Sequence, residues 1–395
     1  MKILFLSAWC PLPADNGSKL RIAQLLRGLA ARHRVDLLSF APQPPDQASL
    51  ETMRALCGEV ELLLETPFAD RPVGRLAGLL SPRPRSVVAN HSPAMEAAVR
   101  RRAGHSYDLV IASQLHMAPY ALLLPDTPRV LEEVELAIIR EQFADAPSAR
   151  ARLRYGLTWW KTRSYVAGLL RSFGGATVVS ERERELLRPL APAGLPLAVV
   201  PNGVDVAACA GDYGPPEPDV LIYPGAVSYH ANRQAVAFFA AEVLPHIRAK
   251  RPAARLRVTG RASPQEIATL PADPGLEFTG YLEDVRPAVA RAWAEVVPLR
   301  TGGGTRLKVL EALALGTPLV STSKGVEGLD LLAGREVLLA DTPADFAAQT
   351  LRLLADPSLR TELSTQGRLA ATRYDWSHSV TALEELVERV GANKR

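Results

Sequence analysis

Residues that could do chemistry are concentrated in the stretch Pro298–Leu329. A mostly apolar run, Ala294–Leu299, predicts a buried strand, and Gly302–Gly304 follow it. Thr305 then occupies the N-cap position of a predicted helix with leucines at helical spacing. Backbone N–H groups that are left unpaired at such a strand-to-helix turn carry partial positive charge and bind anions. The stretch therefore predicts a phosphate site.

Three charged side chains accompany these glycines. Arg306 and Lys308 bring two cations to the predicted phosphate site. Glu311 lies about one and a half turns into the helix, in an otherwise apolar segment. A carboxylate among apolar residues is stable where it accepts hydrogen bonds, for example from sugar hydroxyls in a cleft. The spacing fits a solvent-facing glutamate on an amphipathic helix equally well.

Strand and helix patterns alternate along nearly the whole chain. The alternation predicts an α/β fold of parallel βαβ units, whose ligands bind at the carboxyl ends of the strands. After the turn Pro201–Asp205, a glycine- and proline-rich segment without periodicity runs to Asp219 and predicts a linker between two similar halves. The expected strands are Lys2–Trp9, Val35–Phe40, Val60–Leu64, Tyr107–Ala112, Ala176–Ser180 and Leu197–Val200 before the linker, and Val220–Tyr223, Arg255–Thr259, Leu276–Thr279, Ala294–Leu299, Leu319–Ser321 and Glu336–Ala340 after it.

Two features of the first half lie where a ligand would bind. The loop Cys10–Ser18 carries Asn16 and Gly17 just before a predicted helix, which suits an anion-facing turn. It lacks a dinucleotide-binding fingerprint, so a plain strand-to-helix turn explains it as well. His116 follows the predicted strand Tyr107–Ala112 at its carboxyl end. A lone histidine is more often structural than ligand-binding, and both alternatives stay open.

Length and composition limit the class of protein. A chain of 395 residues predicts two domains. The net charge of +4 is too small to imply a nucleic-acid partner. Three widely spaced cysteines form neither a disulfide framework nor a metal cluster, which suits the reducing cytoplasm. No apolar run reaches about 18 residues, and the apolar start is expected to be a buried strand rather than a signal peptide.

The mostly helical region Glu135–Phe173 combines arginines and lysines with leucines, Trp159 and Trp160. A pair of amphipathic helices with solvated cations explains this pattern. The alternative is a surface that contacts an anionic membrane or an acidic acceptor. We therefore expect a cytoplasmic protein that could lie peripherally on a membrane.

Several motifs together resemble the GT-B glycosyltransferases of the large retaining family four, also called glycosyl transferases group one. The resemblance covers nearly the whole chain and is strongest from Val199 onward. The motifs that carry it are VVSERER (Val178–Arg184), VVPNGVD (Val199–Asp205), GLEFTGYLEDV (Gly275–Val285), VLEALALGTPLVST (Val309–Thr322) and RYDWSHSV (Arg373–Val380).

The resemblance implies two Rossmann-like, doubly wound domains that face each other across a cleft. Residues 1–205 would bind the acceptor, and a C-terminal helix at 378–395 would cross back to this domain. Residues 206–377 would bind a nucleoside diphosphate sugar. No metal and no other cofactor is expected, because a helix dipole and basic side chains neutralise the departing diphosphate.

In the donor domain, Glu311 matches the family's glutamate that binds the ribose hydroxyls. Gly303 stands where the family usually has a first glutamate that contacts the donor sugar, and this is a departure from the pattern. Gly304 matches the following glycine, whose amide approaches the donor. Glu327, in GVEG, matches an acidic residue of the cleft more weakly.

A second departure concerns the diphosphate. The family often has an arginine in the segment that is GAVSYHANR here (Gly225–Arg233), and this chain has alanine at that position. We therefore expect Arg306, Lys308 or Arg261 to bind the diphosphate instead. In the first domain, Gly17 resembles the glycine of a diphosphate-facing loop. His116 matches a histidine that the family often places near the donor sugar.

The activity implied is transfer of a hexose from a nucleoside diphosphate sugar to an acceptor hydroxyl, with retention of the anomeric configuration. His116 and Glu311 are the expected catalytic residues, and the acceptor could be a saccharide, a lipid or a small molecule. Two alternatives remain, a sugar-nucleotide epimerase of the same fold and a non-catalytic sugar-nucleotide-binding protein, the latter prompted by Gly303. A dinucleotide dehydrogenase is excluded, because no predicted strand ends in the required glycine fingerprint with a downstream acid.

Overall fold

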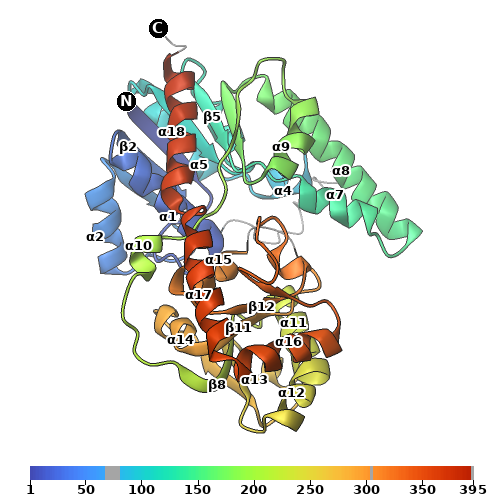
Figure 1. Cartoon of the computed structure of the whole chain (residues 1–395). Coiled ribbons are helices and arrows are strands. Elements are labelled where there is room, and N and C mark those ends of the chain that lie inside the picture. Colours follow the sequence, from blue (N-terminus) through green and yellow to red (C-terminus); the bar gives the residue numbers. More distant parts are fainter. Residues whose placement is uncertain (67–80, 303–305, 393–395) are drawn as a thin grey trace. The chain divides into compact units, whose positions relative to one another are not determined.

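The computed structural model describes residues 1–66, 81–302 and 306–392. The chain forms two compact units, one of Met1–Asn202 with Ser377–Arg395 and one of Gly203–Trp376 (Figure 1). The chain leaves the first unit within the predicted turn Pro201–Asp205. The predicted domain limits, at residues 205 and 377, lie close to these two crossings.

The first unit contains a seven-stranded parallel sheet with the order β3-β2-β1-β4-β5-β6-β7. The sheet grows in one direction from β1 to β3 and in the other from β4 to β7, so the chain reverses between β1 and β4. In doubly wound sheets, ligands bind at the carboxyl ends of the strands at this reversal. The strands are β1 (Lys2–Ser7), β2 (Arg34–Phe40), β3 (Val60–Leu63), β4 (Leu109–Ser113), β5 (Arg129–Glu132), β6 (Gly175–Val178) and β7 (Leu197–Val199).

Helices cover both faces of this sheet because its strands are apolar on both sides. Ile3 and Phe5 pack against one set of helices, and Leu4 and Leu6 pack against another. The first set is α1 (Gly17–Ala30), α2 (Gln47–Leu56) and the C-terminal α18 (Trp376–Ala392). The second includes α5 (Pro93–Arg101), α6 (Ala118–Ala121), α8 (Ala149–Leu170) and α9 (Glu181–Leu187). The remaining helices are α4 (Arg85–Ala89) and α7 (Ala137–Ala144).

The C-terminal helix α18 lies close against the first unit. A Cβ atom on Gly28 of α1 would come within 2.3 Å of Val380. Leu383, Leu386 and Val387 of α18 belong to the core on this face of the sheet. Only a residue without a side chain allows α1 and α18 to approach this closely.

The second unit contains a six-stranded parallel sheet with the order β10-β9-β8-β11-β12-β13. The chain reverses between β8 and β11, so the loops that follow these two strands lie next to each other. The strands are β8 (Glu217–Pro224), β9 (Arg255–Thr259), β10 (Leu276–Gly280), β11 (Ala292–Val297), β12 (Leu319–Ser321) and β13 (Leu338–Leu339). The helices are α10 (Val206–Cys209), α11 (His230–Phe238), α12 (Leu244–Lys250), α13 (Pro264–Ile267), α14 (Arg286–Ala290), α15 (Leu307–Leu315), α16 (Pro343–Ala355) and α17 (Pro357–Thr372).

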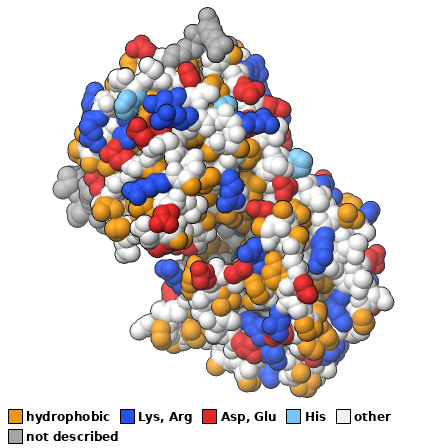
Figure 2. All heavy atoms as spheres, turned by 90° about the vertical axis from the view of Figure 1, so that its left-hand side faces the viewer, with side chains coloured by type: hydrophobic (Ala, Val, Ile, Leu, Met, Phe, Trp, Pro, Cys, Tyr) orange, Lys and Arg blue, Asp and Glu red, His pale blue; other side chains and the backbone are white. Residues whose placement is uncertain are grey.

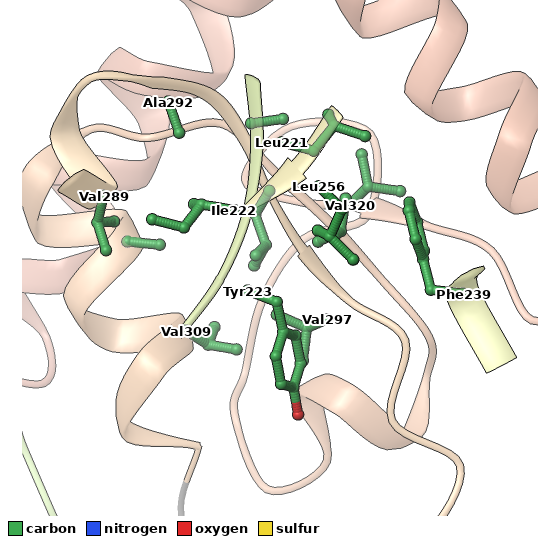
Figure 3. Close-up of a cluster of buried hydrophobic side chains, with 14 of the residues drawn as sticks. Leu221, Ile222, Tyr223, Phe239, Leu256, Val289, Ala292, Val297, Val309 and Val320 are labelled. Carbon is green, nitrogen blue, oxygen red and sulfur yellow. The ribbon is translucent and has the colours of Figure 1, made fainter. Parts of the chain in front are cut away.

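The core of this unit is built mainly from aliphatic side chains of the central strands and of the helices that cover them. Leu221, Ile222, Leu256 and Val320 form one cluster, shown in Figure 3. Tyr223 lies at the edge of the cluster with its hydroxyl group directed away from it (Figure 3). The polar end of a fully buried tyrosine therefore reaches toward the carboxyl end of β8.

Three element predictions differ from the structure. The short strand β5 was not expected, because its four residues, RVLE, lie between a proline and an acidic run and show no clear alternation. The predicted linker before Asp219 contains the short helix α10 and the first residues of β8. The single helix predicted for Arg233–Arg251 is α11 and α12 with a π-helical turn between them, where Pro245 lies in the first turn of α12.

The surface carries charges of both signs. Lysine and arginine side chains are interspersed with aspartate and glutamate side chains over the face shown in Figure 2. On helix α8, Leu153 is 78% exposed and Trp160 is 61% exposed, so this helix presents apolar side chains to solvent. Among the described residues, no helix has both the length and the apolar character needed to cross a membrane.

Candidate active site

The site is built at the reversal point of the second sheet, where the loops after β8 and β11 meet. Helix α15 begins at Leu307, and Arg306 is its N-cap residue without a side-chain capping hydrogen bond. The prediction that Thr305 is the N-cap is therefore wrong by one residue. Gly302 has a φ of 104°, a conformation that favours glycine. Gly303, Gly304 and Thr305 lie outside the described residues.

Lys308 is the cation most directly placed at this edge. Its Nζ lies 3.7 Å from the centroid of the Tyr223 ring and 3.3 Å from Oδ1 of Asn232. The hydroxyl group of Tyr223 donates a 2.7 Å hydrogen bond to the same Asn232 oxygen. The pKa of Lys308 is lowered to about 7, chiefly by burial; Glu295 opposes this shift and Arg306 adds to it. The amine is thus held in place, and about half of it is protonated near pH 7.

The turn after β8 leaves room for Lys308 because it begins with glycine. A Cβ atom on Gly225 would lie 2.9 Å from Lys308 Nζ and 2.8 Å from Nδ2 of Asn232. Asn232 in turn donates from Nδ2 to the backbone oxygen of Ala226 at 3.0 Å. Any larger residue in place of Gly225 would displace the ammonium group from this position.

Arg306 has a different role from Lys308. Its side chain is buried, and NH2 donates to the backbone oxygens of Gly302 at 2.8 Å and of Lys324 at 3.2 Å. The same nitrogen lies 4.0 Å from Oε2 of Glu327, a half-exposed carboxylate that also pairs with Lys324. Arg306 therefore ties the loop after β11 to the segment after β12, and Glu327 lies beside it.

Arg261 lies in the loop after β9, next to the turn after β8. The backbone oxygen of Arg261 accepts a 3.1 Å hydrogen bond from the Val227 N–H. Its guanidinium group is exposed and lies 5.2 Å from the centroid of the Tyr281 ring. Arg261 is therefore a solvated cation near Lys308 in the fold, with freedom to reorient toward an anion.

Glu311 lies on the same side of α15 as Lys308, because residues three apart on a helix are neighbours. Its carboxylate is half-buried. Its pKa is raised to about 7, chiefly by burial; Arg286 opposes this shift and Asp284 adds to it. A partly desolvated carboxylate of this kind gains from hydrogen-bond donors such as sugar hydroxyls.

Glu295 is a charged residue of this region that the sequence analysis placed in an apolar strand. It is fully buried in β11, and neither carboxylate oxygen has a hydrogen-bond partner among the described residues. Burial raises its pKa well above the usual value, and Lys308 lowers it. The signal was present in the sequence as a lone acidic residue within an otherwise apolar run.

In the first unit, Gly17 and His116 lie at the reversal point between β1 and β4. Gly17 is the first residue of α1, and Asn16 caps this helix by accepting a 3.1 Å hydrogen bond from the Lys19 N–H. His116 lies just beyond β4 and lines a pocket of about 260 Å³. Burial lowers the pKa of His116 to about 4, so its imidazole is neutral above pH 5.

Comparison with known families identifies the chain. The model of Glycosyltransferase Family 4 matches residues 16–208, and the model of Glycosyl transferases group 1 matches residues 218–356. The chain belongs to this glycosyltransferase family. A D-inositol 3-phosphate glycosyltransferase of Corynebacterium jeikeium is 34% identical over 86 residues, which are 21% of this chain. This match spans about a fifth of that relative's length (20%).

Solved structures show the same fold for this glycosyltransferase. A sucrose-phosphate synthase from Thermosynechococcus elongatus is 18% identical, with both chains covered completely and a TM-score of 0.67. The Anabaena protein HepE in complex with UDP is 16% identical, with 98% of this chain and 100% of that chain covered and a TM-score of 0.65. The predicted fold class, GT-B with two Rossmann-like domains, is confirmed.

The described residues of the glycosyltransferase contain no group of three or more His, Cys, Asp or Glu side chains that could hold a metal ion. The second unit brings together Arg306, Lys308, Glu311 and Glu327 on α15 and the adjoining segments, with Arg261 close to the same edge of the sheet. Gly17 and His116 belong to the first unit and share its reversal point.

Proposed function

We propose that this glycosyltransferase moves a hexose from a nucleoside diphosphate sugar to an acceptor hydroxyl, with retention of the anomeric configuration. The observation that carries the proposal is the placement of Lys308 and Glu311 on one side of α15, at the reversal point of the second sheet. A cation for the diphosphate and a carboxylate for the ribose hydroxyls are what such a donor needs. The solved complexes of HepE with UDP and with UDP-glucose support the choice of donor.

In this reaction the anomeric carbon forms a bond with the acceptor oxygen while its bond to the diphosphate oxygen breaks. The proton of the acceptor hydroxyl passes to the leaving diphosphate. Side chains of the second unit stabilise the charge that grows on the diphosphate, and the protein holds both substrates close to each other. No metal or other cofactor is part of the proposal.

The proposal is tested by incubating the protein with UDP-, GDP-, ADP- and dTDP-sugars and a panel of saccharide, lipid and small-molecule acceptors. Product formation with the anomeric configuration of the donor, determined by NMR, supports it. An inverted product contradicts retention. An epimer formed from the sugar nucleotide without any acceptor would identify an epimerase, and tight binding without turnover would identify a sugar-nucleotide sensor.

Lys308→Ala is expected to weaken binding of the tightest sugar nucleotide by about ten- to a hundred-fold at pH 6.5, because a hydrogen bond to a charged group contributes about 1.5–3 kcal/mol. Arg261→Ala is expected to act in the same direction and less strongly, since its guanidinium group is solvated. Arg306→Ala would also disturb the loop that its side chain ties together. Isothermal titration calorimetry gives the affinities, and unchanged binding in all three variants contradicts the assignment.

His116→Ala is expected to lower kcat by about ten-fold or more and to change the Kd of the sugar nucleotide little, because a polar contact near the reacting carbon acts mainly in the transition state. The neutral imidazole also predicts that this loss is the same at pH 6 and pH 8. His105→Ala is the control, since His105 is an exposed histidine of the same unit and lines neither this pocket nor the hollow beside it. If the His116→Ala variant had the same kcat as the natural protein, His116 would have no role in the reaction.

The first unit is the proposed acceptor side. A hollow of about 610 Å³ adjoins the His116 pocket and shares Arg83, His91, Pro119 and Tyr120 with it.

We also propose a cytoplasmic location with peripheral membrane contact through α7 and α8, where exposed apolar side chains lie among arginines. Pelleting with vesicles that contain or lack anionic lipid tests this contact, and equal recovery in both supernatants speaks against it.

A further inference from the structure

The hollow beside the His116 pocket has a volume of about 610 Å³, within the range of about 300–1,000 Å³ that is typical of small-molecule sites. Its walls include α6, the residues that follow α6, and the C-terminal part of α8. Most side chains on these walls are apolar or aromatic: Pro119, Tyr120, Leu122, Leu123, Tyr165 and Leu169. Such a lining favours a ligand with an aliphatic part, because apolar surface on both partners is then removed from water.

Several polar groups of the hollow are already bonded to protein atoms. The hydroxyl group of Tyr120 accepts a 2.7 Å hydrogen bond from the Ser92 N–H and donates to the backbone oxygen of Asn90 at 3.2 Å. Nε2 of His91 lies 3.2 Å from Oε2 of Glu96. Tyr120 therefore offers mainly its ring to a ligand, and the hollow offers mainly apolar surface.

Helix α8 carries a stripe of exposed apolar side chains that continues into the hollow. Leu153, Leu157 and Trp160 are all exposed. They follow one another at spacings of four and three residues, so they lie on one side of the helix. The next positions on this side are Ser164 and Gly168, and both line the hollow. The stripe and the hollow thus form one continuous path along α8.

The charges along this path are positive. Helix α8 has no aspartate or glutamate, and its basic residues are Arg150, Arg152, Arg154, Lys161 and Arg163. A further cation lies at the inner end of the path, because Arg83 lines both the hollow and the His116 pocket. The side chain of Arg83 is exposed, so a ligand can reach it. An anionic group between the hollow and His116 would therefore meet a guanidinium group, which suits a phosphate.

We propose that the acceptor is a lipid phosphate. Its aliphatic chain enters the hollow along the α8 stripe, its phosphate lies at Arg83, and its hydroxyl-bearing head group reaches His116. The inference rests on the proposed function, because it names the acceptor class of the same reaction. The order of hollow, cation and His116 along the protein then matches the order of chain, phosphate and hydroxyl along such a lipid.

Gly168 allows the hollow to be filled, because a Cβ atom there would meet no heavy atom of the described residues within 4 Å. The probe is monomeric decanoyl lysophosphatidylglycerol, titrated calorimetrically below its micelle concentration. Gly168→Leu is expected to weaken its binding by about ten-fold or more, since each methylene group that the leucine displaces contributes about four-fold to affinity. Thr158→Leu, which adds a leucine to another side of α8, is the control and should bind the probe like the natural protein.

Arg83 is tested with ligands that differ by their phosphate or their chain. Arg83→Gln is expected to weaken binding of the lysolipid by about ten-fold and to leave that of monodecanoylglycerol, which has no phosphate, unchanged. Glycerol phosphate, which has no chain, should bind the natural protein at least about ten-fold more weakly than the lysolipid. Arg54→Gln is the control, since Arg54 is exposed on α2, which packs against the other face of the sheet. Equal effects of the two arginine substitutions would overturn the phosphate contact.

The outcomes separate the lipid site from the proposed function. Equal lysolipid affinity in Gly168→Leu and the natural protein, or no binding to either, overturns the lipid site whether or not sugar is transferred. Transfer only onto a soluble saccharide, with the same KM in Gly168→Leu, overturns it and keeps the proposed function. Lysolipid binding that Gly168→Leu removes, without sugar transfer to any acceptor, supports the lipid site and contradicts the proposed function. If Gly168→Leu does not fold, Ser164→Leu fills the same hollow from an exposed position.

Discussion

Glu311→Ala is expected to raise the Kd of the nucleoside diphosphate sugar by about ten- to a hundred-fold, since each hydrogen bond to a charged acceptor contributes about 1.5–3 kcal/mol. Glu311 is half-buried on α15, beside Arg286 and Asp284. If its carboxylate accepts hydrogen bonds from the ribose hydroxyls, the loss of affinity in Glu311→Ala should occur only with ligands that contain the nucleoside. Inorganic pyrophosphate, which has no ribose, should therefore bind the variant and the natural protein alike in calorimetric titrations.

The proposed contact between Glu311 and the ribose also predicts that the affinity for the sugar nucleotide depends on pH. Because the pKa of Glu311 is raised to about 7, the carboxylate form is gained as pH rises through neutrality, so the ribose contact strengthens there. Lys308 loses charge over the same range, and the affinity for the sugar nucleotide should pass through a maximum near pH 7. Glu311→Gln should abolish the acidic side of this profile. Glu242→Ala, at an exposed position of the same unit, is the control. If Glu311→Ala weakened the binding of pyrophosphate as much as that of the sugar nucleotide, this result would contradict the assignment of Glu311 to the ribose.

Arg21→Met is expected to lower the free energy of unfolding by about 3–5 kcal/mol, because it leaves a buried carboxylate without its cation. Arg21 is fully buried on α1, and its NH2 lies 2.7 Å from Oε1 of Glu132, which is also fully buried. Its NH1 donates to Oδ1 of Asn202 at 3.0 Å. Asn202 belongs to the PNGVD motif, at the point where the chain leaves the first unit. We therefore expect the substitution of Arg21 to destabilise this turn as well.

Denaturant titrations followed by circular dichroism measure this loss. The double variant Arg21→Met/Glu132→Leu should recover most of the stability, because the carboxylate is removed together with its partner. Arg100→Ala is the control, since Arg100 is exposed and its pair with Glu96 should contribute less than about 1 kcal/mol. An Arg21→Met variant that unfolds at the same denaturant concentration as the natural protein would show that the pair adds no net stability.

Most of the fold could be predicted from local patterns. Continuous apolar runs located β1, β2 and β12 to within two residues, because a strand that is buried on both faces must be mostly apolar along its length. The caps Asn16 and Ser92 mark the starts of α1 and α5. β5 was missed because four residues are too few to establish a period, and only its pairing with β4 and β6 makes it a strand.

The candidate site could be predicted in part. A glycine-rich turn followed by Lys308 and Glu311 indicated a donor site, and both residues lie on one side of α15 at the reversal point of their sheet. The sequence does not distinguish the roles of Arg306 and Lys308. In the structure, Arg306 links the loop after β11 to the segment after β12. Tyr223 and Asn232 come from β8 and α11, far from Lys308 along the chain, and no local spacing connects them with it.

Most strands and helices and the family could be predicted from the sequence alone, because hydrophobic period, turn residues and motifs are properties of neighbouring positions. The tertiary structure decided which buried charges meet. Arg21 of α1 meets Glu132 of β5, because the order of the strands brings together elements that are distant in sequence. A buried charge is stable only beside its partner, and that partner is chosen by the packing of the sheets rather than by the residues next to it.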